Sequence, residues 1–363
     1  MMSARVVVAM SGGVDSSVAA WLLREEGYEV VGLFMRMGVF AETETAPRRS
    51  CCSLADAADA RRVADLLGIP FYVLDFQAEF DRIIKYFCDE YCRGRTPNPC
   101  IVCNRDLKFG RLFEKARQIG ADLIATGHYA RIEKAPAGPV LKRGLDPAKD
   151  QSYVLFAMAP EQLAHTLLPL GAKRKADVRA MARDLRLPVQ EKPDSQEICF
   201  VPDDDYMRLL RERRPDALRP GVIVDTAGRV LARHEGVARF TIGQRHGLGI
   251  AVGEPRYVVD INPETAVVTV GPREALLRKE MDVADVNWLV PGPVPESLGA
   301  SVQIRYTHRA APATVRAVGS RRVHVIFDEP QSAITPGQAA VFYEGDVVLG
   351  GGWIAGQRVM HNP

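Results

Sequence analysis

Three cysteines offer the most distinctive chemistry in this chain. Cys100 and Cys103 stand at C-x-x-C spacing in TPNPCIVCN, residues 96–104, and Cys199 lies far along the chain in PDSQEICFV. A C-x-x-C pair can supply half of a zinc site, a dithiol redox centre, ligands for a metal cluster or a nucleophile that handles sulfur. Cys199 alone is typical of a small buried thiol at the start of an apolar run. The groups that the fold brings beside these thiols decide between the alternatives.

The other cysteines form two pairs. Cys88 and Cys92 lie four residues apart in a predicted helix, so they share one face and are typical of small buried side chains. Together with Cys100 and Cys103 they also give the zinc pattern C-x₃-C-x₇-C-x₂-C, although the rigid helix and the prolines of the link oppose that geometry. The adjacent cysteines 51–52 lie in a polar stretch, and neighbouring residues seldom chelate one ion well.

A glycine-rich turn near the N-terminus predicts a binding site for an anion. The stretch VVVAMSGGVDSS runs from a buried strand through Gly12 and Gly13 into a helix that begins at Asp15. Glycines let the backbone expose its N–H groups, and a helix N-terminus carries partial positive charge, so both attract phosphate. The turn differs from the G-x-G-x-x-G motif and lacks the lysine of G-x-x-x-x-G-K-[ST]. The alternative is a plain strand–helix turn with Asp15 as its N-cap.

Composition indicates a globular chain without a membrane segment. The 363 residues carry a formal net charge of +2, so any surface for a polyanion has to be a local patch. No apolar run reaches the ~18 residues that span a bilayer, and no signal peptide is apparent. We therefore expect a cytoplasmic protein whose seven cysteines are thiols, metal ligands or catalytic groups rather than a disulfide framework.

Two hydrophobic patterns divide the chain. Up to about residue 205, strands alternate with helices, which is typical of an α/β domain with a parallel sheet. Strands are predicted at 5–10, 28–35, 70–76 and 121–128, and helices at 15–27, 54–68, 79–93 and 107–119. Beyond that point, short runs between turn residues favour β domains, either barrel or sandwich. The predicted domains are 1–205, 206–278 and 279–363.

Several motifs together resemble one family along the whole chain. SGGVDSS is similar to the pyrophosphatase loop of enzymes that split ATP into AMP and pyrophosphate. In order, the chain also carries GRTPNPCIVCN, ATGHYAR, GLDPAKDQSYVL, SQEICFV, GQRHGLG and TPGQAAVFYEGDVVLGGGWI. This combination resembles the tRNA-specific 2-thiouridylases. The resemblance implies an N-terminal Rossmann-like sheet of the adenine-nucleotide-hydrolase type, a small β-rich central domain and a C-terminal β-barrel that contacts tRNA.

The resemblance also implies a reaction and the residues that carry it. ATP and magnesium would activate the 2-oxygen of the wobble uridine of tRNA, and a persulfide supplied by a cysteine desulfurase or sulfur-relay protein would replace that oxygen by sulfur. Cys103 matches the catalytic nucleophile and Cys199 the persulfide carrier. ATP is expected at Ala9, Met10, Ser11, Gly12, Gly13, Val14, Asp15, Ser16, Met35 and Gly127, with Asp15 near the magnesium ion. The target base and the rest of the tRNA are expected at Asn98, Pro99, Cys100, His128, Lys149, Asp150, Gln151, Arg305, Tyr306 and Gln338.

Other interpretations stay open at this point. Cys100, Cys103 and Cys199 could bind three irons of a [4Fe–4S] cluster, with the fourth iron holding sulfide. Some members of the family carry an aspartate where this chain has Cys100, and a thiol need not take over its proton transfer. The same ATP loop would suit a synthetase that amidates a small molecule, and a zinc-stabilised RNA-binding module is a further alternative. The arginines of 203–220 fit an RNA surface or a helix that complements its own dipole, whereas those of 304–322 lie on predicted strands beside aromatic residues.

Overall fold

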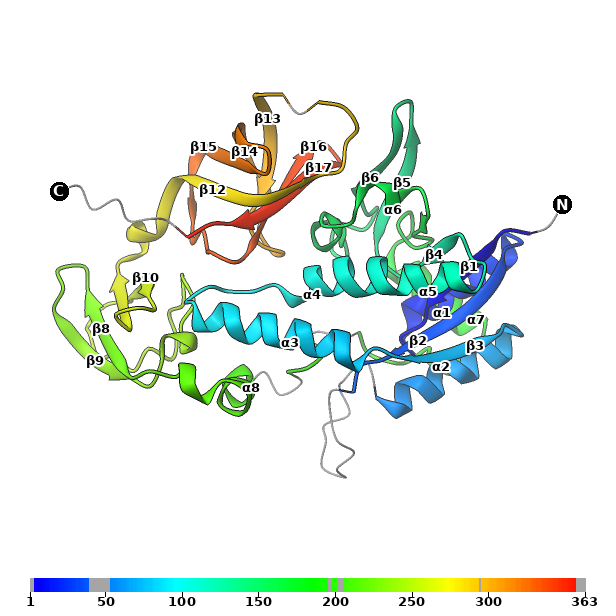
Figure 1. Ribbon diagram of the computed structural model, residues 1–363, viewed down its shortest axis with the longest axis horizontal. Coiled ribbons are helices and arrows are strands. Elements are labelled where there is room, and N and C mark those ends of the chain that lie inside the picture. Colours follow the sequence, from blue (N-terminus) through cyan, green and yellow to red (C-terminus); the bar gives the residue numbers. More distant parts are fainter. Residues whose placement is uncertain (1–2, 39–52, 195–197, 202–204, 294, 357–363) are drawn as a thin grey trace.

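The computed structural model describes residues 3–38, 53–194, 198–201, 205–293 and 295–356 (Figure 1). Its N-terminal domain is built on a five-stranded parallel sheet in the order β3-β2-β1-β4-β7. The strands are β1 Arg5–Ala9, β2 Glu29–Arg36, β3 Phe71–Asp75, β4 Leu123–Ala125 and β7 Thr166–Leu167. The predicted parallel α/β sheet is therefore confirmed, with β7 as a short edge strand that the sequence pattern did not indicate.

Helices cover both faces of this sheet. Val6 and Val8 of β1 pack into one hydrophobic cluster and Val7 into another, since successive side chains of a strand point to opposite faces. Residues of α1, α2 and α7 contribute to the first cluster, and residues of α3, η1 and α5 contribute to the second. The helices of the domain are α1 Val14–Glu25, α2 Leu54–Leu67, α3 Gln77–Cys92, α4 Pro99–Val102, η1 Cys103–Arg111, α5 Leu112–Gln118, η2 Ser152–Leu155, α6 Pro160–Leu163 and α7 Lys175–Asp184.

One helical segment begins earlier than the sequence pattern predicted. The expected helix at 107–119 is the end of a continuous stretch, α4, η1 and α5, that starts at Pro99. Proline suits the first position of a helix because its fixed φ matches the helix and its missing N–H has no partner there in any case. The Asn98 side chain caps the start by accepting the Ile101 N–H at 3.3 Å. The C-x-x-C pair therefore stands on a helix, and η1, a nine-residue π-helix, begins at Cys103.

A smaller four-stranded sheet follows the helix α8, Tyr206–Arg213. Its order is β10-β11-β8-β9, and the β11–β8 pair is parallel while the outer pairs are antiparallel. The core of this domain holds the fully buried side chains of Ile223, Val258, Val268 and Val270. Its elements are η3 Pro215–Ala217, β8 Gly221–Asp225, β9 Val230–His234, η4 Val237–Arg239, β10 Tyr257–Asn262 and β11 Val267–Gly271.

The C-terminal domain is a closed β-barrel. β12 pairs with both β15 and β17, so the order β12-β15-β14-β13-β16-β17 returns on itself and leaves no open edge within the barrel. Its elements are η5 Arg273–Leu276, β12 Leu277–Trp288, β13 Ser297–Gln303, β14 Ala311–Gly319, β15 Arg322–Ser332, β16 Ala339–Glu344 and β17 Val347–Ile354. The predicted barrel is confirmed.

A hairpin of the N-terminal domain joins the barrel. β5, Ala130–Ala135, and β6, Gly138–Arg143, form an antiparallel pair, and Val347 of β17 pairs with Lys142 of β6. Figure 1 shows this hairpin beside the barrel. The sequence pattern did not indicate it. In the described part of the chain, no helix is long and apolar enough to cross a membrane.

Candidate active site

The predicted anion loop lies where β1 ends and α1 begins. Gly12 has φ +70°, and a Cβ there would stand 2.2 Å from the backbone oxygen of Asp56, so the chain needs glycine at this point. The Ser16 hydroxyl accepts the Ser11 N–H at 3.1 Å and lies 3.3 Å from the Ser11 hydroxyl. The N-cap of α1 is Gly13, so the alternative interpretation of Asp15 as the N-cap is wrong.

The other residues expected at ATP also gather around this loop. A Cβ on Gly127, just after β4, would stand 2.8 Å from the Asp15 carbonyl carbon and from the Ser16 nitrogen. The end of β4 therefore packs directly against the start of α1, which only a residue without a side chain permits. Met35 is buried in β2, the strand next to β1. The predicted site thus stands at the carboxyl ends of adjacent parallel strands, where α/β sheets bind ligands.

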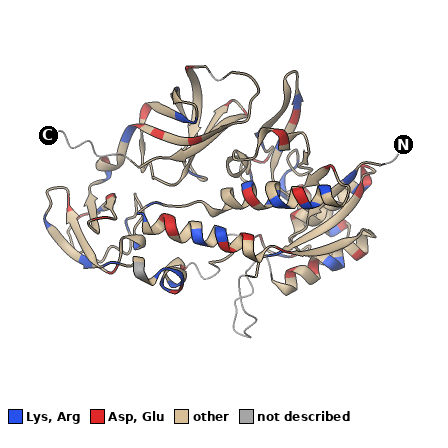
Figure 2. Cartoon of the chain, in the orientation of Figure 1, with Lys and Arg blue, Asp and Glu red and all other residues tan. Residues whose placement is uncertain are grey.

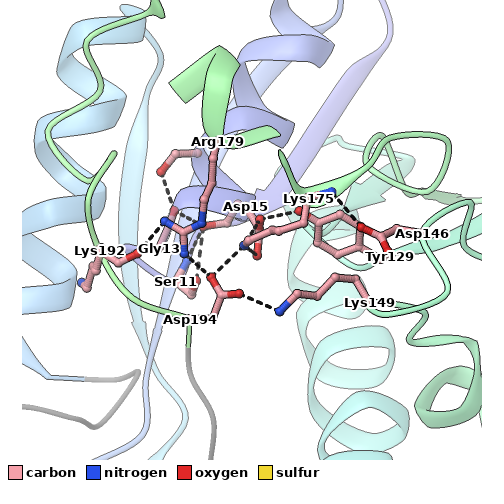
Figure 3. A network of polar contacts seen from close by, with 12 residues as sticks. Ser11, Gly13, Asp15, Tyr129, Asp146, Lys149, Lys175, Arg179, Lys192 and Asp194 are labelled. Carbon is pink, nitrogen blue, oxygen red and sulfur yellow. Dashed lines mark hydrogen bonds and ion pairs between the residues drawn. The ribbon is translucent and has the colours of Figure 1, made fainter. Parts of the chain in front are cut away.

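Asp15 is the centre of a network of polar contacts (Figure 3). Its Oδ1 accepts the Tyr129 hydroxyl at 2.7 Å, and both of its carboxylate oxygens lie 2.7 Å from the Lys175 ammonium. The Lys175 side chain is only 10 % exposed, so its charge is held in place by carboxylates rather than by water. Burial and the nearby Asp15 carboxylate raise the pKa of Tyr129, so this hydroxyl stays a donor at neutral pH.

Asp194 forms ion pairs with three basic side chains beside the same loop. Lys149 and Lys175 lie 2.8 Å from its oxygens, and Arg179 lies 2.7 Å away. Burial by itself would raise the pKa of Asp194, but the hydrogen bonds from the two lysines outweigh burial and lower it to about 2. Lys175 therefore bridges two carboxylates, and it stands where a charged amine could also meet a phosphate group.

A second lysine ties α2 to the loop. The Lys192 ammonium donates to the Gly12 carbonyl oxygen at 2.9 Å and to an Asp59 oxygen at 2.8 Å, and it also pairs with Asp56. Asp56 in turn accepts the Ser53 hydroxyl at 2.6 Å in the capping box that starts α2. Through Lys192, the start of α2 therefore holds the backbone of the anion loop at Gly12.

Sequence reasoning missed five polar partners in this network: Tyr129, Lys175, Arg179, Lys192 and Asp194. Tyr129 and Asp194 do fall inside the quoted motifs ATGHYAR and PDSQEICFV, and that position was the available signal. Lys175 and Arg179 stand in an ordinary amphipathic helix, which carries no such signal.

The cysteines of the described chain do not gather into a metal centre. Cys103 and Cys199 are both half-buried and pack against the same hydrophobic cluster, which includes Phe87, while Cys100 is exposed. No group of three or more His, Cys, Asp or Glu side chains in the described residues has the geometry to hold a metal ion. Burial raises the pKa of Cys88 to about 11, which disfavours the thiolate that zinc requires. The cysteines 51–52 lie outside the described residues.

The segment that carries the C-x-x-C pair is anchored at both ends. After the pair, the buried Asn104 donates from Nδ2 to the Val154 carbonyl oxygen at 3.1 Å. Before it, Gln338 of the barrel donates from Nε2 to the carbonyl oxygens of Thr96, at 3.0 Å, and Pro97, at 3.3 Å. Residues far apart in sequence thus fix the helix on which Cys100 and Cys103 stand.

The residues predicted to meet the target base and tRNA come from all parts of the chain, and some of them lie together. Cys100 and Asp150 are close enough to Tyr306 to raise the pKa of its hydroxyl, behind the larger effect of burial. Tyr306 is nevertheless 45 % exposed, so part of its ring faces solvent. Asp150 accepts hydrogen bonds from Gly144, Ser152 and Arg143. Gln151 accepts the Tyr129 N–H, and Arg305 donates to the Ser332 carbonyl oxygen.

His128 is not at the surface. It is 8 % exposed, its Nδ1 lies 2.6 Å from the Thr126 hydroxyl, and its ring packs 6.1 Å from that of Phe109. Burial, with a smaller effect of Lys108, lowers the pKa of His128 well below its usual value, so the ring is neutral at pH 7. A contact between His128 and RNA requires the surrounding side chains to move.

Two arginines at the end of α8 form ion pairs with acidic residues of α3. On and just after α8, Arg213 pairs with Asp81 at 3.5 Å and Arg214 pairs with Asp89, both on α3. Figure 2 shows both signs of charge interspersed along α3 and α5. Asp205 caps α8 and two arginines stand in its last turn, which favours the interpretation of 203–220 as a helix that complements its own dipole.

Three family models divide the chain at the observed domains. Residues 4–203 match the model described as "tRNA methyl transferase HUP domain". Residues 208–272 match "tRNA methyl transferase PRC-barrel domain", and residues 278–354 match "Aminomethyltransferase beta-barrel domain". The fold and the loop site therefore define a HUP-domain enzyme, a class that uses ATP, with two β domains attached.

Close relatives then give the family. A "tRNA-specific 2-thiouridylase MnmA" of Geobacter metallireducens is 54% identical over 355 residues, which cover 96% of each chain. The protein of the same description from Carboxydothermus hydrogenoformans is 52% identical over 358 residues, covering 96% of this chain and 97% of that one. The chain belongs to the tRNA-specific 2-thiouridylase family. The predicted family and the predicted enzyme class, a sulfurtransferase, are confirmed.

Proposed function

We propose that this chain replaces the 2-oxygen of the wobble uridine of tRNA by sulfur, with cleavage of ATP into AMP and pyrophosphate. One observation carries the proposal: the domain that positions the anion loop also holds Cys103 and Cys199 against a single hydrophobic cluster. A synthetase that amidates a small molecule would use the same loop and would need neither thiol. Relatives named for 2-thiolation of tRNA add to this argument.

ATP is proposed to bind with its phosphates on the N–H groups from Ser11 to Ser16. Lys175 pairs with Asp15 and Asp194 before ATP arrives, and its ammonium can turn to a phosphate oxygen without leaving the site. Magnesium fits beside these two carboxylates, because it prefers oxygen ligands and is commonly held by one or two carboxylates together with substrate phosphates. When bound, it would stabilise negative charge on the leaving pyrophosphate.

The proposed chemistry balances with two thiols. The uridine 2-oxygen attacks the α-phosphorus of ATP and pyrophosphate leaves, which turns that oxygen into part of a good leaving group. The terminal sulfur of a Cys199 persulfide attacks C2, and AMP departs with the oxygen. Cys103 then attacks the Cys199 sulfur, which frees the thiocarbonyl and leaves a Cys103–Cys199 disulfide. A thiol reductant restores both cysteines, and an external persulfide donor reloads Cys199.

The proposed chemistry uses thiols rather than a [4Fe–4S] cluster. The cluster's three ligands would have to be Cys100, Cys103 and Cys199, and these side chains do not form a group of ligands in the structure. No step of the proposed mechanism passes through a cluster.

The tRNA is proposed to reach this site between the N-terminal domain and the barrel. Cys100 and Tyr306 are exposed there, and Tyr306 can stack on a base that has left the anticodon stack. The neighbouring groups proposed to contact the base or its phosphates are Asn98, Pro99, His128, Lys149, Asp150, Gln151 and Arg305, whereas the Gln338 side chain donates to the Thr96 and Pro97 carbonyl oxygens.

Nucleoside mass spectrometry tests the proposal directly. Unmodified tRNA is incubated with the chain, ATP, magnesium and a persulfide donor, without iron, and we expect 2-thiouridine to form. Cys103→Ser and Cys199→Ser should each lower its formation at least ~1,000-fold, whereas Cys92→Ser, a half-buried thiol outside the proposed chemistry, should keep most of the activity.

Each contrary result has a distinct meaning. Full activity of Cys103→Ser would remove that residue from the mechanism. Thiolation that appears only after iron is added would favour the cluster, and pyrophosphate release without any modified nucleoside would favour a synthetase that acts on a small molecule.

A further inference from the structure

The barrel makes direct backbone contact with the segment that leads into the C-x-x-C pair. The Thr96 N–H donates to the Pro336 carbonyl oxygen at 2.9 Å, and the two hydrogen bonds from the Gln338 side chain reach Thr96 and Pro97. Figure 1 shows the connection from α3 to α4 running beneath the barrel. Three hydrogen bonds therefore join segments 240 residues apart in sequence, at a place with no regular secondary structure.

The barrel side of this contact is rigid. The Gly337 N–H donates to the Ile354 carbonyl oxygen at 3.0 Å, and the Ile354 N–H donates to the Gln338 carbonyl oxygen at 2.9 Å. The turn at residues 336–338 is therefore fixed to the end of β17. Gly337 has φ +88°, and a Cβ there would stand 2.9 Å from the Thr96 oxygen and 3.0 Å from its nitrogen. Glycine thus lets the two backbones touch.

The opposite side of the segment is also held. The Arg95 N–H donates to the Glu90 carbonyl oxygen at 3.0 Å, and the buried Glu90 carboxylate lies 2.7 Å from the Arg95 guanidinium. The segment therefore lies between the end of α3 and the barrel turn. Immediately after it, Asn98 caps α4, and five residues later stands Cys103. A shift of Thr96 and Pro97 would therefore move the Cys103 thiol, because the short helix α4 joins the two.

We propose that Gln338 and Gly337 are positioning residues of the reaction: they hold the segment 95–98, and through it Cys103, in the orientation used for sulfur transfer before any RNA binds. This role differs from the tRNA contact expected for Gln338. It rests on the proposed function of Cys103, but the position of the segment can be measured whether or not that function holds.

Hydrogen exchange and thiol alkylation of the chain alone, without tRNA or ATP, test the proposal. In Gln338→Ala and in Gln338→Glu, which keeps the shape but cannot donate, we expect the Thr96 amide to exchange and Cys103 to react with iodoacetamide about tenfold faster than in the natural chain. The matched control is Glu280→Ala, an exposed residue of the same barrel on β12.

Steady-state kinetics add a readout that a loss of RNA contact would not produce. The two Gln338 variants should lower kcat for thiolation about tenfold while the KM for tRNA changes less than about twofold. Gly337→Ala should act in the same direction, and its thermal unfolding shows whether it folds. The proposal is overturned if exchange of Thr96 and alkylation of Cys103 stay within about twofold of the natural chain, and a raised KM alone would then identify Gln338 as an RNA contact.

Discussion

At the scale of single residues, Lys175 is central to the proposed ATP site. It bridges Asp15 and Asp194, and all three are at least two-thirds buried. Removing one partner of such a set leaves uncompensated charge, which costs more than the ion pair itself contributes.

Lys175→Met should therefore destabilise the chain by about 3 kcal/mol and lower pyrophosphate release by at least about 100-fold. The remaining carboxylates would also repel the phosphates of ATP. Urea unfolding and a pyrophosphate assay measure the two effects, and Arg183→Met, an exposed residue of the same helix, is the control. Unchanged pyrophosphate release in a folded variant would show that Lys175 serves the fold alone.

His128 predicts a pH dependence of stability. Its pKa in the folded chain lies well below the usual 6.5 because it is buried, so below pH 6.5 the unfolded chain binds a proton that the folded chain does not. Stability therefore falls as the pH drops from about 6.5 to 5, with further contributions from His234 and His308, whose pKa values burial also lowers.

His128→Asn should flatten this part of the stability profile, because asparagine does not titrate and can keep a polar atom near Thr126. Urea unfolding at several pH values measures the slope, and His165→Asn, which removes an exposed histidine, is the control. An identical slope in His128→Asn and the natural chain would show that His128 does not cause the loss of stability at low pH.

At the scale of elements, the site depends on the close approach of β4 to α1. Gly127 allows this contact without an unusual backbone conformation, so substitution there tests the approach itself. A substitution of Gly12 would be harder to interpret, because it would strain the positive φ and would also clash with the backbone of Asp56.

Gly127→Ala should raise the KM for ATP about tenfold or more, since the added Cβ has to push the N-terminus of α1 away from the end of β4. The pyrophosphate assay measures the KM at saturating tRNA. Gly253→Ala has nothing within 4 Å of the added atom and is the control. Equal KM values for the two variants would show that the loop tolerates displacement.

At the scale of the whole molecule, one arginine connects the N-terminal domain to the barrel. Arg143 of β6 stacks on the ring of Tyr343, 3.6 Å from its centroid, and donates to Asp150 and to Gln303 of β13. It also ends the hairpin strand that pairs with β17. Arg143 thus links the barrel to the loop that faces Cys100 and Tyr306.

Arg143→Ala should lower the free energy of unfolding by about 2 kcal/mol and separate the unfolding of the barrel from that of the N-terminal domain. Arg143→Lys should recover little, because an ammonium cannot stack and donate in two directions as the guanidinium does. Tryptophan fluorescence reports on Trp288 and Trp353 of the barrel and on Trp21 of α1 during urea unfolding, so Trp21→Phe is used as the background, and Lys279→Ala is the control. A single transition with unchanged midpoint would contradict this coupling.

The chemistry proposed for the site rests largely on local sequence. The order of residues from Ser11 to Ser16 predicts an anion loop because strand, glycines and helix N-terminus are contiguous, whereas the spacing of Cys100 and Cys103 by itself left several chemistries open. The alternation of strands and helices likewise predicts the parallel sheet, because each hydrophobic period is a property of neighbouring residues.

Only the tertiary structure decided which charges meet. Lys175 and Asp15 are separated by 160 residues, and Gln338 lies 242 residues from Thr96, so no periodicity or spacing connects them. The β5–β6 hairpin likewise pairs with a strand that follows it by about two hundred positions. Such contacts depend on how the sheet, the helices and the barrel pack, and that packing is set by the buried side chains of the entire chain rather than by any one segment.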